Sequence, residues 1–287
     1  MENTKSRGKF QEMWLRLKKD KLAVISLCVI LVLVLCAVFA GLIFNYDRDA
    51  IMQDVPNRLK GPSSEHWFGT DELGRDIFAR VIFGARTSLS IGVVSVFFSI
   101  GIAIIIGAVS GYFGGVVDNV IMRITDVFLA MPGTLLVISL VAAFGTSIVN
   151  LILATVIAYM PGYVRIVRAT VMTVKTNAYI EAAKALGGNS AQIIVKHCIL
   201  NSMAPIIVQA TLGISTIIIA TAALSYMGLG AQPPIPEWGA MLASGQASFR
   251  TSPHVMLFPA FFIFITSLCF NLLGDGLRDA LDPKLKD

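Results

Sequence analysis

The stretch LAVISLCVILVLVLCAVFAGLIFNY, residues 22–46, contains no charged side chain. A bilayer core of about 30 Å is crossed by about 20 apolar residues in a helix, so this stretch is long enough for one crossing. Only 14% of the 287 residues are charged, whereas soluble domains contain about 25%. Because lipid solvates charge poorly, the composition predicts an all-α membrane protein.

Four more uncharged tracts follow along the chain, at 87–117, 127–164, 197–236 and 251–274. The second of these would be about 57 Å long as one helix at about 1.5 Å per residue, which is too long for one crossing. The turn-forming run Phe144-Gly145-Thr146-Ser147 divides it into two. We therefore predict six spans, at about 22–44, 88–112, 124–143, 149–168, 204–226 and 255–275.

A basic segment precedes the first span. By the positive-inside rule, these charges predict a cytoplasmic N-terminus, and six spans return the C-terminus to the same side. Residues 10–21 mix apolar and basic side chains, as is typical of a helix lying on the membrane surface. The net charge of +5 thus reflects membrane orientation and does not indicate nucleic-acid binding. The basic residues are Lys5, Arg7, Lys9, Arg16, Lys18, Lys19 and Lys21.

These features divide the chain into three parts. Residues 1–45 are expected to form the interfacial helix and the first span, and residues 46–86 an external loop. Residues 87–287 are expected to form a core domain of five spans, with a cytoplasmic loop at about 171–203.

The external loop contains a run of turn-forming and charged residues. Its glycines permit tight turns, and its acidic and basic side chains can pair with one another. Judged from the residues alone, a structured, solvated loop with local ion pairs is favoured over a binding site. The candidate residues are Gly69, Thr70, Asp71, Gly74, Arg75 and Asp76.

The cytoplasmic loop predicts a helical hairpin. Residues 179–186 are strong helix formers, and Gly187 with Gly188 ends the helix as C-cap glycines do. Asn189 and Gln192 are spaced as a capping box that opens a second helix. The shape suits a rigid knob held in a partner's groove, although a purely structural hairpin fits the residues equally well. The candidate contact residues are Glu181, Ala182, Ala183, Leu186 and Gly187.

Two patterns near the second and third spans bear on packing. Glycines at 107, 111 and 115 let helices approach closely, and we favour packing within the subunit over a subunit interface. Pro132 removes a backbone hydrogen bond and is expected to kink its helix. Charges beside a span usually face an aqueous cavity or a partner. Here they are Asp118, Arg123 and Asp126.

The sequence lacks the usual signatures of an enzyme. It has no G-x-x-x-x-G-K-[ST] run to cradle phosphate and no H-E-x-x-H run to bind zinc. The three histidines are scattered, and the four cysteines lack metal-ligand spacing. We therefore expect no catalytic residues, no metal site and no cofactor in this chain.

Three segments resemble motifs of one family, the permease subunits of peptide/nickel-type ABC importers. Residues 181–187, EAAKALG, resemble its cytoplasmic E-A-A-x-x-x-G loop. Residues 66–89 are similar to its H-x-x-G-T-D-x-x-G-R-D…G-A-R-x-S-L signature, and residues 224–239 to its L-S-F-L-G-L-G…P-E-W-G element. Because the three motifs occur in the expected order, the resemblance is specific, and it covers the chain from about residue 10 onward.

The resemblance implies the type I importer permease fold and, within the family, the C-type subunit. It also implies a heterodimer with a sister permease, two cytoplasmic ATPases that bind ATP and Mg²⁺, and an external solute-binding protein. Residues 181–187 would contact an ATPase. Two positions depart from the family pattern: Leu200 replaces a proline, so that the helix into the fifth span is expected to run straighter, and Thr221 replaces a glutamate.

The function implied is import of oligopeptides or dipeptides by alternating access. Related permeases carry nickel, other metal chelates or glycosides, so these substrates are alternatives. A different class, an ion-coupled secondary transporter, would need acidic residues inside the membrane. The predicted spans contain almost none, with Asp275 at one end the nearest candidate.

Overall fold

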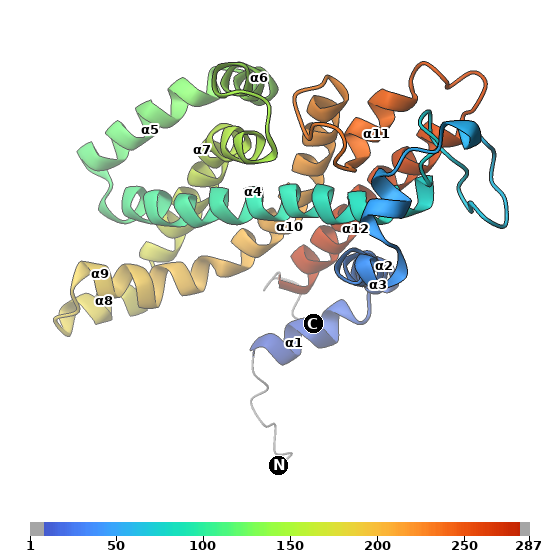
Figure 1. Cartoon of the computed structure of the whole chain (residues 1–287). Helices are drawn as coiled ribbons and strands as arrows, with labels where there is room; N and C mark the ends of the chain where they lie inside the picture. Colours follow the sequence, from blue (N-terminus) through green and yellow to red (C-terminus); the bar gives the residue numbers. More distant parts are fainter. Residues whose placement is uncertain (1–8, 282–287) are drawn as a thin grey trace, which may run out of the picture.

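The computed structural model describes the backbone of residues 9–281 and the side chains of residues 13–281. Within this part of the chain every regular element is a helix, as expected for an all-α protein (Figure 1). Lys5 and Arg7 of the basic N-terminal segment lie outside the described residues. The helices are α1 (Lys9–Leu17), α2 (Lys21–Val38), α3 (Ala40–Ile43), η1 (Tyr46–Ile51), η2 (Val55–Asn57), α4 (Ile77–Phe113), α5 (Gly115–Leu129), α6 (Gly133–Phe144), α7 (Ile148–Lys175), α8 (Ala178–Ala185), α9 (Ser190–Ile193), η3 (Ile194–Ile199), α10 (Leu200–Tyr226), α11 (Trp238–Gly245) and α12 (His254–Leu281).

Among the described residues, five helices are long and apolar enough to cross a membrane, and the bent pair α5–α6 makes a sixth if it counts as one span. The five are α2, α4, α7, α12 and the continuous helix Ser190–Tyr226, which contains α10. Their order matches the six predicted spans. The helix into the fifth span is continuous through Leu200, with the π-helical turn η3 directly before it, and the expected straighter course stays a prediction.

The third predicted span is bent by 82° between α5 and α6. The kink expected at Pro132 is confirmed, because α5 ends at Leu129 and Pro132 caps α6. Proline supplies no N–H donor and disfavours helical geometry in the residue before it, which explains a break at this position. The two halves therefore point in different directions.

The helix that contains the second predicted span begins earlier than the predicted external loop allows. We expected a loop through residue 86 and a helix from residue 88, whereas α4 starts at Ile77. The predicted start was placed after the last charged side chain of this region, because a charge is costly inside a membrane. Arg80 is buried, and its guanidinium donates to the Ala50 carbonyl at 2.6 Å. A charge with partners can be accommodated within a buried helix.

The helices α4 and α7 touch through their backbones. A Cβ atom on Gly107 would lie 2.8 Å from the Val164 carbonyl oxygen, and one on Gly111 would lie 2.7 Å from the Arg168 carbonyl oxygen. Glycine therefore permits an approach that any side chain would prevent. These two glycines serve packing within the subunit, whereas Gly115 has φ +56° and open space around it.

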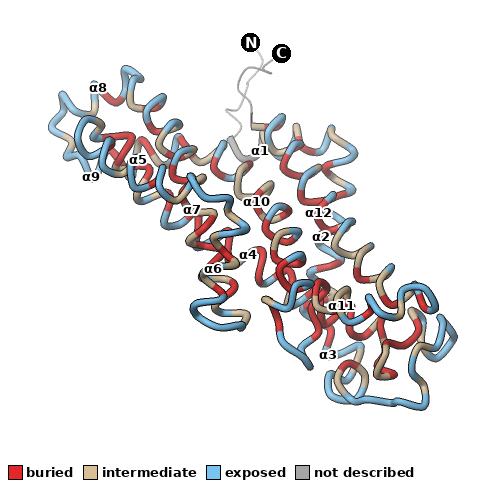
Figure 2. Tube along the Cα trace, turned by 90° about the horizontal axis from the view of Figure 1, so that it is seen from above, coloured by how far each residue is buried: buried red, intermediate tan, exposed pale blue. Residues whose placement is uncertain are grey.

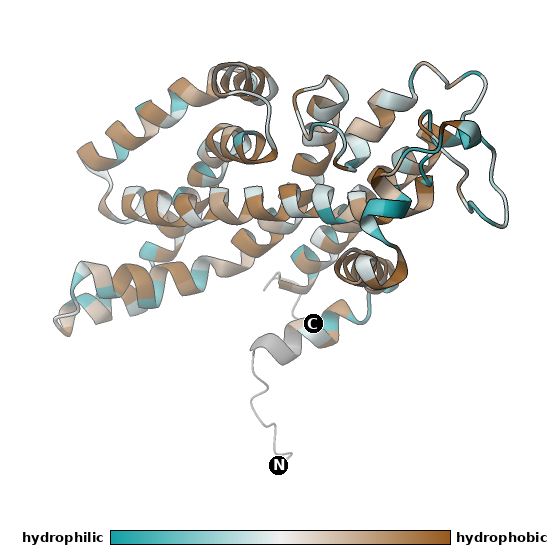
Figure 3. Ribbon diagram, in the orientation of Figure 1, coloured by the Kyte–Doolittle hydropathy of each residue, from teal (hydrophilic) through white to brown (hydrophobic). Residues whose placement is uncertain are grey.

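The helix α2 has one face against the bundle and one apolar exposed face. Its buried side faces α12 and α4, and its exposed side after Lys21 is made mostly of large aliphatic side chains, with Cys28 among them. Lipid tails solvate such a surface well, so this face is suited to contact with the bilayer. Figure 3 shows the same hydrophobic colouring along the other long helices. The exposed residues of α2 include Leu22, Ile25, Leu31, Val32, Leu35 and Val38.

The bundle has two distinct ends (Figure 2). The hairpin of α8 and α9 lies at one end, and α3, α11 and the segment that joins α3 to α4 lie at the other. We call residues 44–76 the α3–α4 segment. Its hydrophilic residues gather at that end of the molecule (Figure 3). The long helices thus separate two polar regions, as expected for a chain that crosses a membrane.

A substitution at the α4–α7 contact is predicted to destabilise the bundle. Gly107→Val places a branched side chain against the Val164 carbonyl oxygen, and overpacking of this kind costs about 1–3 kcal/mol. The measurement is the thermal unfolding midpoint of the purified protein in detergent. Gly101→Val is the matched control on the same helix, since a Cβ there meets nothing within 4 Å. Equal midpoints for the two variants would contradict the close approach.

Candidate functional site

The helix α8 ends in a glycine turn. Gly187 has φ +82°, a left-handed conformation that glycine adopts without strain. Its N–H donates to the Lys184 carbonyl and the Gly188 N–H to the Ala183 carbonyl, each at 3.0 Å. These two bonds form a Schellman motif, which satisfies the last carbonyls of the helix. The predicted sharp stop of the first hairpin helix is therefore confirmed.

The second half of the hairpin begins with the predicted cap. The Asn189 side chain accepts a hydrogen bond from the Gln192 N–H at 2.7 Å, which opens α9. The π-helical turn η3 follows and continues into α10. The hairpin is thus connected rigidly to two long helices, α7 before it and α10 after it.

The two faces of α8 have different environments. Ile180 is fully buried in a cluster with residues of α4 and α7, and Ala183 packs partly against it. Glu181 and Ala182 are exposed, and Leu186 at the tip is 89% exposed. The structure therefore separates the candidate residues into a half-buried anchor at Ala183 and an exposed knob formed by the others.

One residue of this region was not singled out from the sequence. Tyr112, near the end of α4, is 7% exposed, and the ammonium groups of Lys175 and Lys184 lie 5.7 and 5.5 Å from its ring centre. Such distances are typical of cation–π contacts. No local pattern reveals this contact, because the three residues come from α4, α7 and α8.

At the opposite end of the bundle, the α3–α4 segment folds around Asp71. One Asp71 oxygen accepts hydrogen bonds from the Leu73 and Arg75 N–H groups at 2.9 and 3.0 Å. The other accepts from Arg75 Nε at 2.7 Å, with Arg80 Nε at 3.4 Å. Both Asp71 and Arg75 are buried. The local ion pairs expected from the sequence are therefore present, but the prediction that they are solvated is wrong for these residues, because the segment folds over them.

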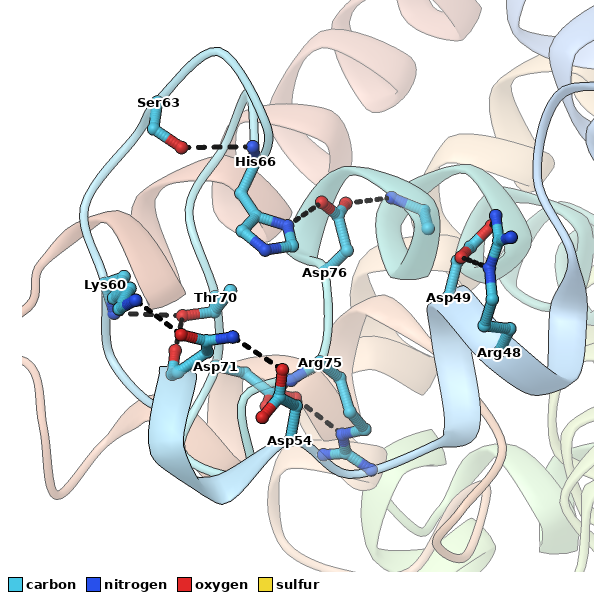
Figure 4. Close-up of polar contacts among 12 residues, drawn as sticks. Arg48, Asp49, Asp54, Lys60, Ser63, His66, Thr70, Asp71, Arg75 and Asp76 are labelled. Atoms are coloured by element: carbon cyan, nitrogen blue, oxygen red, sulfur yellow. Dashed lines mark hydrogen bonds and ion pairs between the residues drawn. The ribbon is translucent and has the colours of Figure 1, made fainter.

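The other candidate residues of this segment hold its backbone in place (Figure 4). Asp76 accepts from the Ala79 N–H at 2.8 Å and so caps α4, and its second oxygen lies 2.7 Å from His66 Nδ1. The Thr70 hydroxyl donates to the Asn57 carbonyl and accepts from the Lys60 N–H. Gly69 and Gly74 both have φ +78°, as the predicted tight turns require. All six candidates thus meet in one structured unit.

A third cluster connects the loop before α11 to α4. Glu237 caps α11 by accepting from the Gly239 and Ala240 N–H groups at 3.0 and 2.8 Å, and it also accepts from the Ser88 hydroxyl at 3.0 Å. Burial raises the pKa of the Glu237 carboxyl, and its hydrogen bonds act in the opposite direction. The Trp238 indole donates to the Val81 carbonyl at 3.0 Å.

The charges beside the third span form pairs between α5 and α7. Arg168 donates twice to the Asp118 carboxylate, and the Ser110 hydroxyl donates to it as well. Arg165 pairs with Asp126 where both side chains are about half exposed. Asp118 is buried within the subunit, which contradicts the expectation of an aqueous cavity or a partner at that position. Arg123 and Asp126 are exposed, and for them the expectation stays a prediction.

These clusters position helices and carry no catalytic arrangement. Among the side chains of residues 13–281, no group of three or more His, Cys, Asp or Glu could hold a metal ion. The buried polar side chains described above are occupied by partners within the chain. The arrangement is therefore a helical bundle with an exposed hairpin helix, α8, at one end and the α3–α4 segment, held by buried ion pairs, at the other. Such a bundle is suited to moving its helices relative to one another in a membrane.

Comparisons with known proteins identify the family. Residues 103–287 match the family of binding-protein-dependent transport system inner membrane components, and residues 8–62 match the N-terminal transmembrane domain of oligopeptide transport permease C. A dipeptide transport system permease protein of Alkalihalophilus pseudofirmus is 46% identical, over 96% of this chain and 90% of the relative. A glutathione transport system permease protein of Escherichia coli is 45% identical, over 98% of this chain and 92% of the relative.

The chain therefore belongs to the family of binding-protein-dependent transport system inner membrane components. It is a multi-pass membrane permease subunit of an ABC importer, with the type I permease fold, and a transport component rather than an enzyme. Its family works with an ATPase and a binding protein. The resemblance drawn from the three sequence motifs is thus confirmed.

The buried ion pair of the α3–α4 segment is predicted to stabilise it strongly. Arg75→Ala leaves the Asp71 carboxylate buried with its two backbone N–H donors and only the longer ionic contact to Arg80, and the free energy of unfolding should fall by about 3 kcal/mol. Arg48→Ala is the matched control, because Arg48 Nε also lies 2.7 Å from an aspartate but the side chain is 74% exposed. Thermal unfolding in detergent is the measurement. A similar loss in both variants would contradict the role assigned to burial.

Proposed function

We propose that this chain is one of two permease subunits of an ATP-driven importer of oligopeptides or dipeptides in the cytoplasmic membrane. Two relatives are named for transport of a dipeptide and of glutathione, which are both short peptides. The substrate passes between this chain and a related sister permease. The chain alone therefore transports nothing.

The observation that carries the proposal is the exposed knob of α8. Leu186 is 89% exposed at its tip, beside the small exposed side chain of Ala182. An apolar side chain that protrudes from a rigid turn is typical of the anchor of a protein interface. We assign a cytoplasmic ATPase subunit as the partner whose groove receives α8. Two such subunits bind ATP and Mg²⁺, and this chain holds no cofactor.

We assign the α3–α4 segment as the surface on which the external solute-binding protein docks. Its buried pairs hold its shape without a partner, and a preordered surface loses less entropy on binding. In this assignment Asp71, Arg75 and Asp76 shape the docking surface from within. Contacts to the binding protein come from the exposed residues around them.

We assign the surface formed by α5 and α6 as the contact surface for the sister permease. Only Asp118 and Thr125 of α5 are buried, and Val116 and Val127 are 78% and 70% exposed. ATP binding to the partner subunits favours one of two arrangements of the permease pair, and that differential affinity drives alternating access. The bend between α5 and α6 gives this surface two halves that differ in direction.

Other substrates and another transport mechanism are weaker candidates. Nickel, other metal chelates or glycosides could pass through the same architecture, since the binding protein largely selects the substrate. An ion-coupled secondary transporter requires a carboxylate that is free to bind an ion inside the membrane. Asp118 and Asp126 of α5 are each paired with an arginine. Asp275, the candidate from the sequence, is an exposed residue in the last two turns of α12 and not in the middle of a span. These positions do not favour that mechanism.

The orientation of the chain is predicted by the basic N-terminal segment. After replacement of the four native cysteines by alanine, Gly61→Cys should react with a membrane-impermeant thiol reagent in intact cells. Thr176→Cys, beside the hairpin, should react only after the membrane is permeabilised. Both positions are exposed, so accessibility differs only by the side of the membrane. Labelling of Thr176→Cys in intact cells would reverse the assigned topology.

The turn at Gly187 is predicted to be required for uptake. Gly187→Val imposes a branched side chain at φ +82°, which costs about 1–3 kcal/mol and shifts the turn that presents Leu186. Losing that much coupling energy should lower uptake by roughly 5- to 150-fold. The measurement is uptake of a labelled dipeptide by vesicles that contain the whole transporter, together with the ATPase that copurifies.

Gly187→Asn is the matched control for this experiment. Asparagine tolerates the left-handed conformation, and nothing lies within 4 Å of the new Cβ, so uptake should stay near the original rate. Glu181→Ala should have a milder effect, since an exposed charge contact contributes about 0–1 kcal/mol. Full uptake by Gly187→Val, with the ATPase still bound, would mean that the hairpin is only structural.

A further inference from the structure

The end of α4 is where the hairpin meets the rest of the bundle. Tyr112 is the penultimate residue of α4 and is 7% exposed. Its ring contacts Lys184 of the hairpin helix α8, at 5.5 Å from the ammonium group to the ring centre. It also contacts Lys175, the last residue of α7, at 5.7 Å. One ring therefore joins the end of α4 to two consecutive helices, α7 and α8, that lie far from it along the chain.

Both lysines make a cation–π contact with the same ring. No carboxylate within the described residues forms an ion pair with Lys175 or Lys184. An ammonium group is attracted to the negative face of an aromatic ring, and the attraction grows as water is excluded. A displacement of α8 therefore changes the position of Lys184 against a ring that is fixed in α4.

The same turn of α4 is also linked to α5. The Ser110 hydroxyl donates to the Asp118 carboxylate, which Arg168 of α7 holds from the other side. Between α4 and α5 stand Gly114 and Gly115, with φ +67° and +56°, and open space surrounds both. A two-glycine turn lets α5 reorient while its first turn stays linked to α4.

We propose that Tyr112 is a positioning residue that transmits the position of the α8 hairpin to the end of α4, and through Ser110 and Asp118 to α5. This inference rests on the proposed function, in which α8 docks on an ATPase and α5 faces the sister permease. The contact is electrostatic and uses the face of the ring. The hydroxyl of Tyr112 makes no hydrogen bond with any described residue, so the ring alone is required.

The test compares two substitutions of Tyr112 in the whole transporter, reconstituted with its sister permease, ATPases and binding protein. Tyr112→Phe keeps the aromatic face and should leave uptake of a radiolabelled dipeptide per ATP hydrolysed unchanged. Tyr112→Leu removes both cation–π contacts and should lower that ratio by about 5- to 30-fold. The ATPase should still copurify with it, because the exposed knob is untouched.

A second pair of variants covers the case in which Tyr112→Leu is not produced as a stable membrane protein that pairs with the sister permease. Lys184→Leu removes one contact from an exposed side chain and should lower the ratio by about 2- to 5-fold. Lys196→Leu is its matched control, an exposed lysine of the same region that forms no ring contact, and should have no effect.

The outcomes separate this inference from the proposed function. An unchanged ratio in Tyr112→Leu, or in Lys184→Leu if the first variant is not produced in that form, would overturn the role of Tyr112. Loss of ATPase copurification by Tyr112→Leu would overturn it too, since the residue would then act on docking. If the unaltered chain binds no ATPase, or if Gly187→Val transports normally, the proposed function itself fails.

Discussion

The architecture depends on the close approach of α4 and α7 at Gly107 and Gly111. Lipid tails are as apolar as the side chains, so association of these helices depends on tight packing rather than on the hydrophobic effect. Glycine lets the α4 backbone reach the carbonyl oxygens of α7. Since α4 also contacts α2, α5, α10, α11 and α12, this one contact determines where the other helices lie.

Two pairs of opposite charge, each with a buried aspartate, lie toward the two ends of the bundle. Asp71 with Arg75 braces one end of the bundle, and Asp118 with Arg168 braces the other. A buried charge without a partner is costly, so each pair defines the geometry of its neighbours. The two ends are therefore stiff, and the apolar helices between them connect one to the other.

The last turn of α4 contacts both the hairpin, through Tyr112, and the bent span, through Ser110. The hairpin is anchored by Ile180 in the apolar cluster and by Lys184 on the Tyr112 ring. The bent span begins at Gly115, three residues after Tyr112, and both Gly114 and Gly115 have a positive φ. The hairpin is held firmly on α4, whereas the glycine turn between α4 and α5 is free to change its backbone angles. This arrangement is suited to converting a movement of the hairpin into a reorientation of α5.

The sequence alone determined the features that depend on neighbouring residues: the apolar tracts, the kink at Pro132, the glycine turn after α8 and the cap at Asn189. Each rests on contacts between residues only a few positions apart. Only the tertiary structure decided where α4 begins, that Asp71 and Arg75 are buried, and that Tyr112 meets two lysines. These depend on partners far along the chain, such as Ala50 for Arg80 and Lys184 for Tyr112. Hydropathy registers a charge but not its partner, so no local pattern could reveal them.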